Sequence, residues 1–193
     1  MTISFGQPTL AIHLKSYDVD TFWIGIFFSV PAVCYVLGAL TVGCLTKAIG
    51  RRGLMFIAFV FLIWGVFLIG TSPLLGIQDE TKIIFVGSCI VGLMAAAITI
   101  PVLPEMLDQI IKKYPALADS PELNDVTAGY FNGCLGIGEA IGPIVSSLLV
   151  QGVGFRSAAD ILALTIFVFT LFFFIFNGRS DMFTPENASE DSS

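Results

Sequence analysis

Glu139 is the residue with the clearest capacity for chemistry, because its carboxyl group falls inside a long apolar stretch of the sequence. A charge at bilayer depth costs at least about 2.5 kcal/mol even on lenient insertion scales, so such residues usually face a cavity or a partner. One helical stripe would carry Asn132, Gly136, Glu139 and Pro143. A carboxyl group there could exchange a proton or attract a cation, and a structural hydrogen bond to another helix is the alternative. We read Glu139 as the only acidic residue deep in an apolar stretch.

The same stretch offers a second face with small residues. Gly138 and Gly142 lie about 100° around the helix from the stripe of Glu139, and small residues at this spacing let another helix approach closely. Pro143 follows at once, leaves a carbonyl unpaired and bends a helix. The sequence therefore predicts that one face packs while the other presents Glu139. Two tyrosines could line a pocket or act only as packing and interface anchors: Tyr35 and Tyr130.

A short basic segment between two apolar stretches is the second candidate site. It comprises Gly43, Lys47, Gly50, Arg51 and Arg52. The glycines would permit a tight turn, and the paired arginines can hydrogen-bond helix C-terminal carbonyls and a carboxylate on a neighbouring helix. An ordinary positively charged loop at the cytoplasmic face of a membrane protein would also explain the basic residues.

The elements that must position these residues are membrane helices. Of the 193 residues, 55% are hydrophobic and only 12% charged, with a mean hydropathy of +0.89, far from the averages of soluble domains. A bilayer core of about 30 Å needs about 20 helical residues. Five stretches are predicted to cross it, namely residues 22–45, 54–71, 83–103, 126–150 and 158–176, and residues 1–14 hold a partial sixth.

The five spans differ in composition. Spans 54–71 and 158–176 are crowded with Phe, Leu and Ile, so we expect them to face lipid. Spans 22–45, 83–103 and 126–150 carry small or polar residues at many positions and are expected in the interior. When the partial first helix is counted, every third helix is expected at the periphery.

The connections complete the expected organisation. Residues 104–125 predict a short amphipathic helix at the interface that ends at Pro115. Its acidic residues Glu105 and Asp108 are most simply solvated, although either could pair with Arg51 or Arg52. The tail, residues 177–193, is acidic and expected to be disordered.

The distribution of basic residues predicts an orientation. Alternating the loops puts six Lys and Arg on one side, Lys47, Arg51, Arg52, Lys112, Lys113 and Arg179, and three on the other, Lys15, Lys82 and Arg156. This bias predicts a multi-pass protein of the plasma membrane or of an organelle or vesicle membrane, with the first side and the C-terminus cytoplasmic.

The segment from Gly43 to Arg52 resembles the G-x-x-x-D-x-x-G-R-R loop of the Major Facilitator Superfamily, with Lys47 at the acidic position. The run Gly138-Glu139-Ala140-Ile141-Gly142-Pro143 resembles the G-x-x-x-G-P signature of drug and amine antiporters in that superfamily, and Gly152 to Ala158 resembles the start of their last helix. The resemblance covers residues 1 to about 176. It implies an all-α membrane protein, the C-terminal half of that fold, with five full transmembrane helices and a partial first one.

Within the superfamily, the motifs are most similar to the vesicular amine and polyamine transporter branch, on Pro101 to Asp108 and Ala140 to Pro143. That resemblance implies proton-coupled antiport of a small organic solute by alternating access, and a cation is one candidate for this solute. Vesicular monoamine carriers have acidic residues where Ala96 and Asn132 stand, which disfavours a monoamine. A non-transporting subunit that acts as a scaffold in a larger complex is the alternative.

Other classes of function lack their signatures. No G-x-x-x-x-G-K-[ST] loop, zinc-ligand spacing or catalytic triad is present, so no enzyme activity, metal or cofactor is expected. The expected partners are the lipid bilayer, a missing N-terminal half or second half-transporter chain and a small-molecule solute, but no nucleic acid. The four cysteines are read as small buried residues rather than disulfides or metal ligands: Cys34, Cys44, Cys89 and Cys134.

Overall fold

The computed structural model describes residues 21–71, 81–118 and 120–177. The expected partial helix within residues 1–14 lies outside these ranges, as does the expected tail from residue 178 onward. Described elements are all helical, in the order α2 (Thr21–Ile49), α3 (Arg51–Ile69), α4 (Thr81–Lys113), the 3-10 helix η2 (Pro115–Leu117), α5 (Pro121–Val153) and α6 (Phe155–Asn177). Five of them are long and apolar enough to cross a membrane. The prediction of an all-α membrane protein with five full spans is confirmed.

The predicted interfacial helix is not a separate element. Its first part is the end of α4, which has 33 residues and runs without a break through Pro101 and Pro104 to Lys113. Membrane helices tolerate internal prolines because neighbouring helices and local adjustments satisfy the freed carbonyls. At 1.5 Å per residue α4 is about 50 Å long, so it extends well beyond a bilayer core of about 30 Å. The prediction of a separate interfacial helix was wrong, because α4 continues through both prolines to Lys113.

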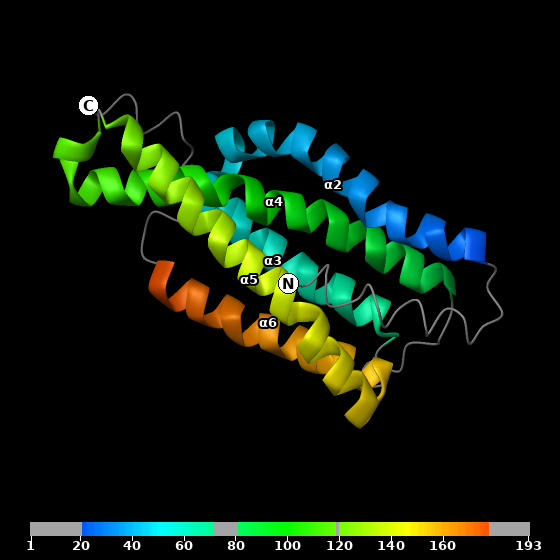
Figure 1. Cartoon of the computed structure of the whole chain (residues 1–193). Helices are drawn as coiled ribbons and strands as arrows, with labels where there is room; N and C mark the ends of the chain where they lie inside the picture. The colour runs from blue at the N-terminus through cyan, green and yellow to red at the C-terminus, as the bar shows by residue number, and fades with distance from the viewer. Residues whose placement is uncertain (1–20, 72–80, 119, 178–193) are drawn as a thin grey trace.

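Helix α4 lies at the centre of the packed part of the chain. It contacts α2 on one side and α3 on the other, and α6 packs against α3, as Figure 1 shows. A core cluster between these helices contains Leu62 and Val66 of α3, Val91 of α4 and Ala163 of α6. Packing of α3 against α4 places the connection between α2 and α3 beside the C-terminal part of α4.

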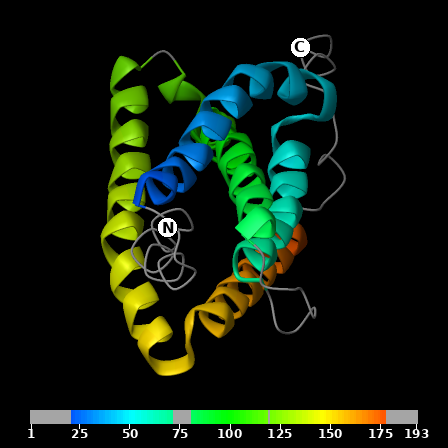
Figure 2. The same ribbon diagram turned by 90° about the vertical axis from the view of Figure 1, so that its right-hand side faces the viewer.

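Helix α5 is the least enclosed. Its only buried residues are Thr127, Gly142 and Ser146, and in Figure 2 it runs along one side of the molecule, away from α3. Only 11% of the most apolar window is buried in α2 and in α5, compared with 39% in α3 and α4. Most of the surface of α2 and α5 is therefore open to lipid or to another protein segment.

The assignment of α3 to the lipid-facing periphery needs correction. One face of α3 is buried along its whole length, from Gly53 to Val66, whereas Phe61 and Trp64 on its other face are exposed. Composition misled the prediction because a protein interior and a bilayer are equally apolar. The apolar residues of α3 therefore pack against α4 and α6 on one face and are exposed on the other.

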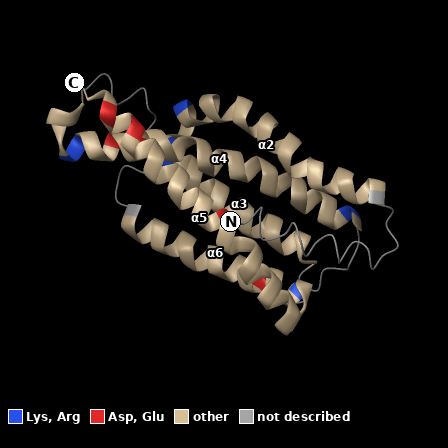
Figure 3. Cartoon of the chain, in the orientation of Figure 1, with Lys and Arg blue, Asp and Glu red and all other residues tan. Residues whose placement is uncertain are grey.

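Charged side chains gather toward the two ends of the helices, and few lie between (Figure 3). One end holds the α2–α3 connection and the C-terminal part of α4, which are joined by ion pairs. The other end holds the end of α3 and the start of α6, which Arg156 joins. The arrangement fits helices that cross a membrane and keep their charges at its surfaces.

Candidate functional site

The turn between α2 and α3 consists of a single residue. Helix α2 ends at Ile49, α3 begins at Arg51, and Gly50 between them has a φ of 82°. This backbone conformation is open to glycine at little cost, whereas a side chain would strain it. The Gly50 N–H donates to the Thr46 carbonyl at 2.9 Å, and the Leu54 N–H donates to the Gly50 carbonyl at 3.1 Å. The buried glycine thus reverses the chain and places Arg51 and Arg52 at the start of α3.

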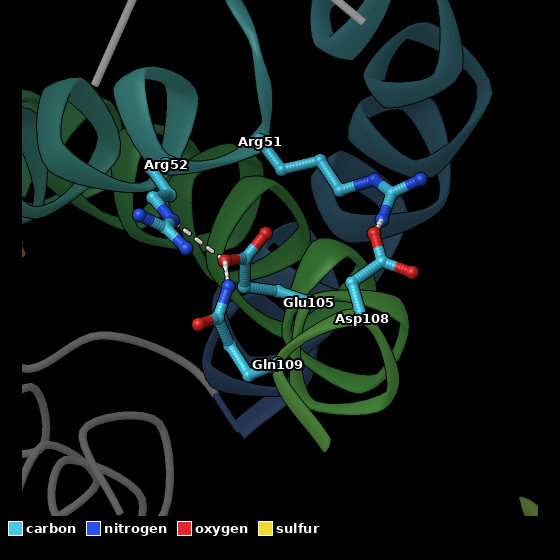
Figure 4. A network of polar contacts seen from close by, with 5 residues as sticks. All are labelled: Arg51, Arg52, Glu105, Asp108 and Gln109. Atoms are coloured by element: carbon cyan, nitrogen blue, oxygen red, sulfur yellow. Dashed lines mark hydrogen bonds and ion pairs between the residues drawn. The ribbon is translucent and has the colours of Figure 1, made fainter. Parts of the chain in front are cut away.

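Both arginines reach carboxylates on α4, as Figure 4 shows. Arg52 Nε donates to Glu105 Oε1 at 2.6 Å, and Arg51 Nη1 pairs with Asp108 Oδ2. Gln109 Nε2 donates to the same oxygen of Glu105 at 3.1 Å. The Arg52 and Glu105 side chains are 24% and 19% exposed, so their pair is partly shielded from water. The network joins the turn to the C-terminal end of α4 by charge-assisted hydrogen bonds.

This network differs from the simplest sequence interpretation, which left Glu105 and Asp108 solvated. Their partners follow from the continuity of α4, which carries both carboxylates past Pro104 to the level of the turn. Lys47, at the position where the resembling motif has an acid, is exposed and makes no ion pair with any residue in the described part of the chain. The negative charge for the arginines therefore comes from α4. Gly43 is exposed on α2, with nothing within 4 Å of where its side chain would begin.

The α5 candidates divide between two faces. Asn132 and Glu139 are exposed, and Tyr130 is 70% exposed. Gly142 is buried, while Gly138 and Pro143 are half-buried. Tyr35 is half-buried on α2. The α5 polar residues Tyr130, Asn132 and Glu139 thus share the open surface of this helix.

The sequence interpretation did not predict a contact at the opposite end of the helices, where α3 ends and α6 begins. Arg156 of α6 donates to the Thr71 carbonyl through Nε at 2.9 Å and through Nη2 at 2.6 Å. Thr71 is fully buried with a φ of 42° and comes directly after Gly70, the cap residue that follows α3. The guanidinium group therefore satisfies a carbonyl at the end of a helix, where orphan acceptors are expected. It ties the end of α3 to the start of α6.

One turn further along α6, Asp160 is a second acidic residue within a predicted span, although it lies near the end of that span whereas Glu139 lies deep in its own. Asp160 is 6% exposed, and its Oδ1 has no hydrogen-bond partner among the residues that the structure describes. It is the third residue of the predicted span 158–176, so position alone could have identified it.

Comparison with known proteins agrees with the membrane-helix fold described above. The sequence model of the Major Facilitator Superfamily matches residues 1–191. The chain belongs to the Major Facilitator Superfamily. The five membrane helices and the arginine–carboxylate network are therefore parts of a transporter-family fold.

Individual relatives are more distant. The chain is 27% identical over 163 residues to the rat protein named MFS-type transporter SLC18B1, an alignment covering 83% of this chain and 35% of the rat protein. It is 24% identical over 163 residues to the human protein of that name, with the same coverage of 83% and 35%. It is 26% identical over 176 residues to the nitrite extrusion protein of Bacillus subtilis, covering 91% of this chain and 39% of that protein. The chain thus spans well under half of these relatives. No solved structure matches it.

Proposed function

We propose that this chain acts as the C-terminal half of a secondary active transporter that works by alternating access. Carriers of this superfamily bind solute between two halves of six helices, and the chain aligns with only 35% to 39% of its relatives. The second half would come from the same longer polypeptide or from a separate chain. The open surfaces of α2 and α5 are where we place it.

Proton-coupled antiport is the proposed mode, with Glu139 as the coupling residue. The observation that carries this assignment is the position of Glu139 on the exposed face of α5, within a membrane span and on one stripe with Asn132. When the second half covers this face, the carboxyl group would lie at the interface between halves, where solute passes. Protonation there would remove a charge that attracts a cation, which couples the two bindings.

A small organic cation of the amine or polyamine class is the first candidate solute. The support is the motif resemblance on Pro101 to Asp108 and Ala140 to Pro143 and the similarity to proteins named MFS-type transporter SLC18B1. A relative named for nitrite extrusion makes a small anion the competing candidate. A carboxylate on the translocation surface favours the cation.

The arginine network supplies the proposed conformational latch. Arg51 and Arg52 hold the α2–α3 turn to α4 in the described conformation, and breaking these pairs would free that end of the helices to separate. We place this end in the cytoplasm because it carries most of the basic residues in the described ranges.

Transport in vesicles tests the proposal. The complete assembly that contains this chain would be reconstituted with an imposed pH gradient, and uptake of radiolabelled spermidine and of nitrite would be compared. We expect Glu139→Gln to insert normally, lose pH-driven accumulation of the cation and retain exchange. Glu122→Gln, at the start of the same helix, is the matched control and should behave as the wild type. Unchanged pH dependence in Glu139→Gln would refute the coupling role.

A scaffold without transport activity is the second candidate. It is favoured by Lys47 at the acidic position of the loop signature and by Ala96 and Asn132 at positions that are acidic in monoamine carriers. Absence of uptake of any solute by the wild-type assembly, with the assembly intact, would support it.

A further inference from the structure

A groove opens between the first turns of α2 and α4, and we call it the α2–α4 groove. Its volume is about 430 Å³, within the range of sites that hold small molecules. The side chains that form it are Trp23, Ile26 and Phe27 of α2 and Lys82, Phe85 and Val86 of α4. Five of these six are apolar, and the sixth is a cation. The groove is separate from Glu139 on α5 and from the arginine network at the other end of α4.

The groove exists because the contact between α2 and α4 changes along their length. Further along, a Cβ atom added to Gly92 of α4 would lie 2.3 Å from the Pro31 carbonyl oxygen of α2, so the backbones nearly touch. In the first turns the rings of Phe27 and Phe85 meet edge to face instead, with centroids 5.6 Å apart. Figure 2 shows the two helices crossing and diverging toward their starts. The two rings, of which Phe27 is buried, form the inner wall of the groove.

The position of the groove along the helices places it at a membrane surface. Helix α2 begins at Thr21 and α4 at Thr81, and both are apolar enough to cross a bilayer. At 1.5 Å per residue, Val86 lies about 8 Å along the axis from the start of α4. Trp23, the third residue of α2, is 55% exposed, and tryptophan is enriched where headgroups meet hydrocarbon. A molecule in the groove would therefore reach both the headgroups and the acyl chains.

The charge at the groove favours an anion. Lys82 is exposed and makes no ion pair with any residue in the described part of the chain. A lysine near the end of a membrane helix lays its apolar stem along the helix and extends its ammonium group to the headgroup layer. No carboxylate lines the groove among the described residues, so a cationic amphiphile would meet only repulsion there. Apolar walls that end at a single cation match an acyl chain that ends at a phosphate.

We propose that the α2–α4 groove binds one molecule of an anionic phospholipid. An acyl chain lies against Trp23 and the rings of Phe27 and Phe85, and the phosphate group accepts a charge-assisted hydrogen bond from the Lys82 ammonium group. A zwitterionic lipid has the same acyl chains but brings a second cation close to Lys82, so it binds more weakly. The bound lipid joins the starts of α2 and α4, and its binding does not depend on the proposed transport function.

Tryptophan fluorescence tests the proposal, because Trp23 and Trp64 are the only two tryptophans in the sequence. The full chain carrying Trp64→Phe reports from the groove. The full chain carrying Trp23→Phe is the matched control, since Trp64 lines a groove of about 470 Å³ between α3 and α6 that has no charged residue among its described lining. Each would be reconstituted in phosphatidylcholine vesicles with increasing fractions of phosphatidylglycerol brominated on its acyl chains, which quenches a tryptophan that it contacts.

We expect half of the quenching of Trp23 at a mole fraction of brominated phosphatidylglycerol several-fold lower than for Trp64. Lys82→Gln should raise this fraction about five-fold, the change expected for one lysine at an anionic surface. Lys47→Gln is the control, because Lys47 is an exposed lysine at the other end of α2 and should leave the fraction unchanged. Val86→Phe should fill the groove and weaken the selective quenching, while circular dichroism shows an unchanged helix content.

Three results would overturn the proposal. Equal half-quenching fractions at Trp23 for brominated phosphatidylglycerol and brominated phosphatidylcholine would show that Lys82 is offset by Asp79 and Glu80, which precede it in the sequence. An unchanged response in Lys82→Gln would remove the phosphate contact. Weaker quenching of Trp23 than of Trp64 by both lipids would show that the groove is closed to lipid, with the apolar residues 1–14 of the chain itself as the occupant.

Discussion

The arginines at the start of α3 show how a departure from a motif can leave its chemistry in place. The acidic position of the loop is occupied by Lys47, yet Arg51 and Arg52 both pair with carboxylates. Asp108 and Glu105 stand three residues apart on α4, so they share a helical face. The carboxylates that balance the positive charge of the turn therefore lie on the neighbouring helix and not in the loop.

A charge exchange tests this pairing. We expect Arg52→Glu to place two negative charges together and to lower thermal stability in detergent, and Glu105→Arg to do the same with two positive charges. The double variant Arg52→Glu/Glu105→Arg should recover part of the loss, because it restores an ion pair. A coupling of about 1.5–3 kcal/mol is expected for a charge-assisted hydrogen bond in this partly shielded place. Additive losses in the double variant would show that the pair contributes nothing to stability.

The sequence predicted which kind of partner a residue needs more readily than which residue that partner is. The arginines could be expected to seek a carboxylate, but which carboxylates face them depends on α4 continuing past two prolines. Asp160 was overlooked although it lies within a predicted span. Its burial depends on packing at the start of α6, which the linear pattern of residues does not contain.

At the scale of helices, close contact is decided by where small residues meet. Gly87 of α4 would place a Cβ atom 2.8 Å from the Ile69 backbone nitrogen, and Gly65 of α3 would place one 3.0 Å from a Val91 methyl carbon. We expected Gly65 in a lipid-facing helix, and the structure places it in the α3–α4 contact. The five spans were predictable from hydrophobic length, but the partner of each helix face was not.

Substitution at the close contact between α2 and α4 measures this packing. Gly92→Ala should destabilise the chain, because its new methyl group meets the backbone of Pro31, which cannot move aside as a side chain can. A loss of about 1–3 kcal/mol is expected for such overpacking. Gly25→Ala is the control, since Gly25 has nothing within 4 Å of the new carbon and alanine favours a helix. Equal melting temperatures of the two variants in detergent would contradict the contact.

For the whole molecule, the most informative feature is that some helices are far more buried than others. Helices α3 and α4 are well enclosed, whereas α2 and α5, expected in the interior from their small and polar residues, are the most exposed. The interior composition and the exposure of α2 and α5 agree if a second half covers their exposed faces. Membrane class, helix number and family could be predicted from this sequence, but an interior position for α2 and α5 cannot be tested within one half.

Orientation in the membrane is a separate prediction. On a cysteine-free background, Lys47→Cys and Arg179→Cys should react with an impermeant maleimide from the cytoplasmic side, and Lys82→Cys from the other side. Residues 47 and 82 flank opposite ends of the described helices. Labelling of residues 47 and 179 from opposite sides would overturn the number of spans.

Uptake into vesicles that contain this chain with and without its second half is the most direct test of the account. With an imposed pH gradient, we predict that spermidine accumulates only in vesicles that hold both halves, and that Gly136→Leu on the open face of α5 abolishes accumulation by blocking their contact. A Cβ atom added to Gly136 would meet nothing within 4 Å in the described part of the chain, so the variant should fold normally alone. Equal accumulation by the chain alone, or by the complete assembly carrying Gly136→Leu, would contradict a transporter built from two halves.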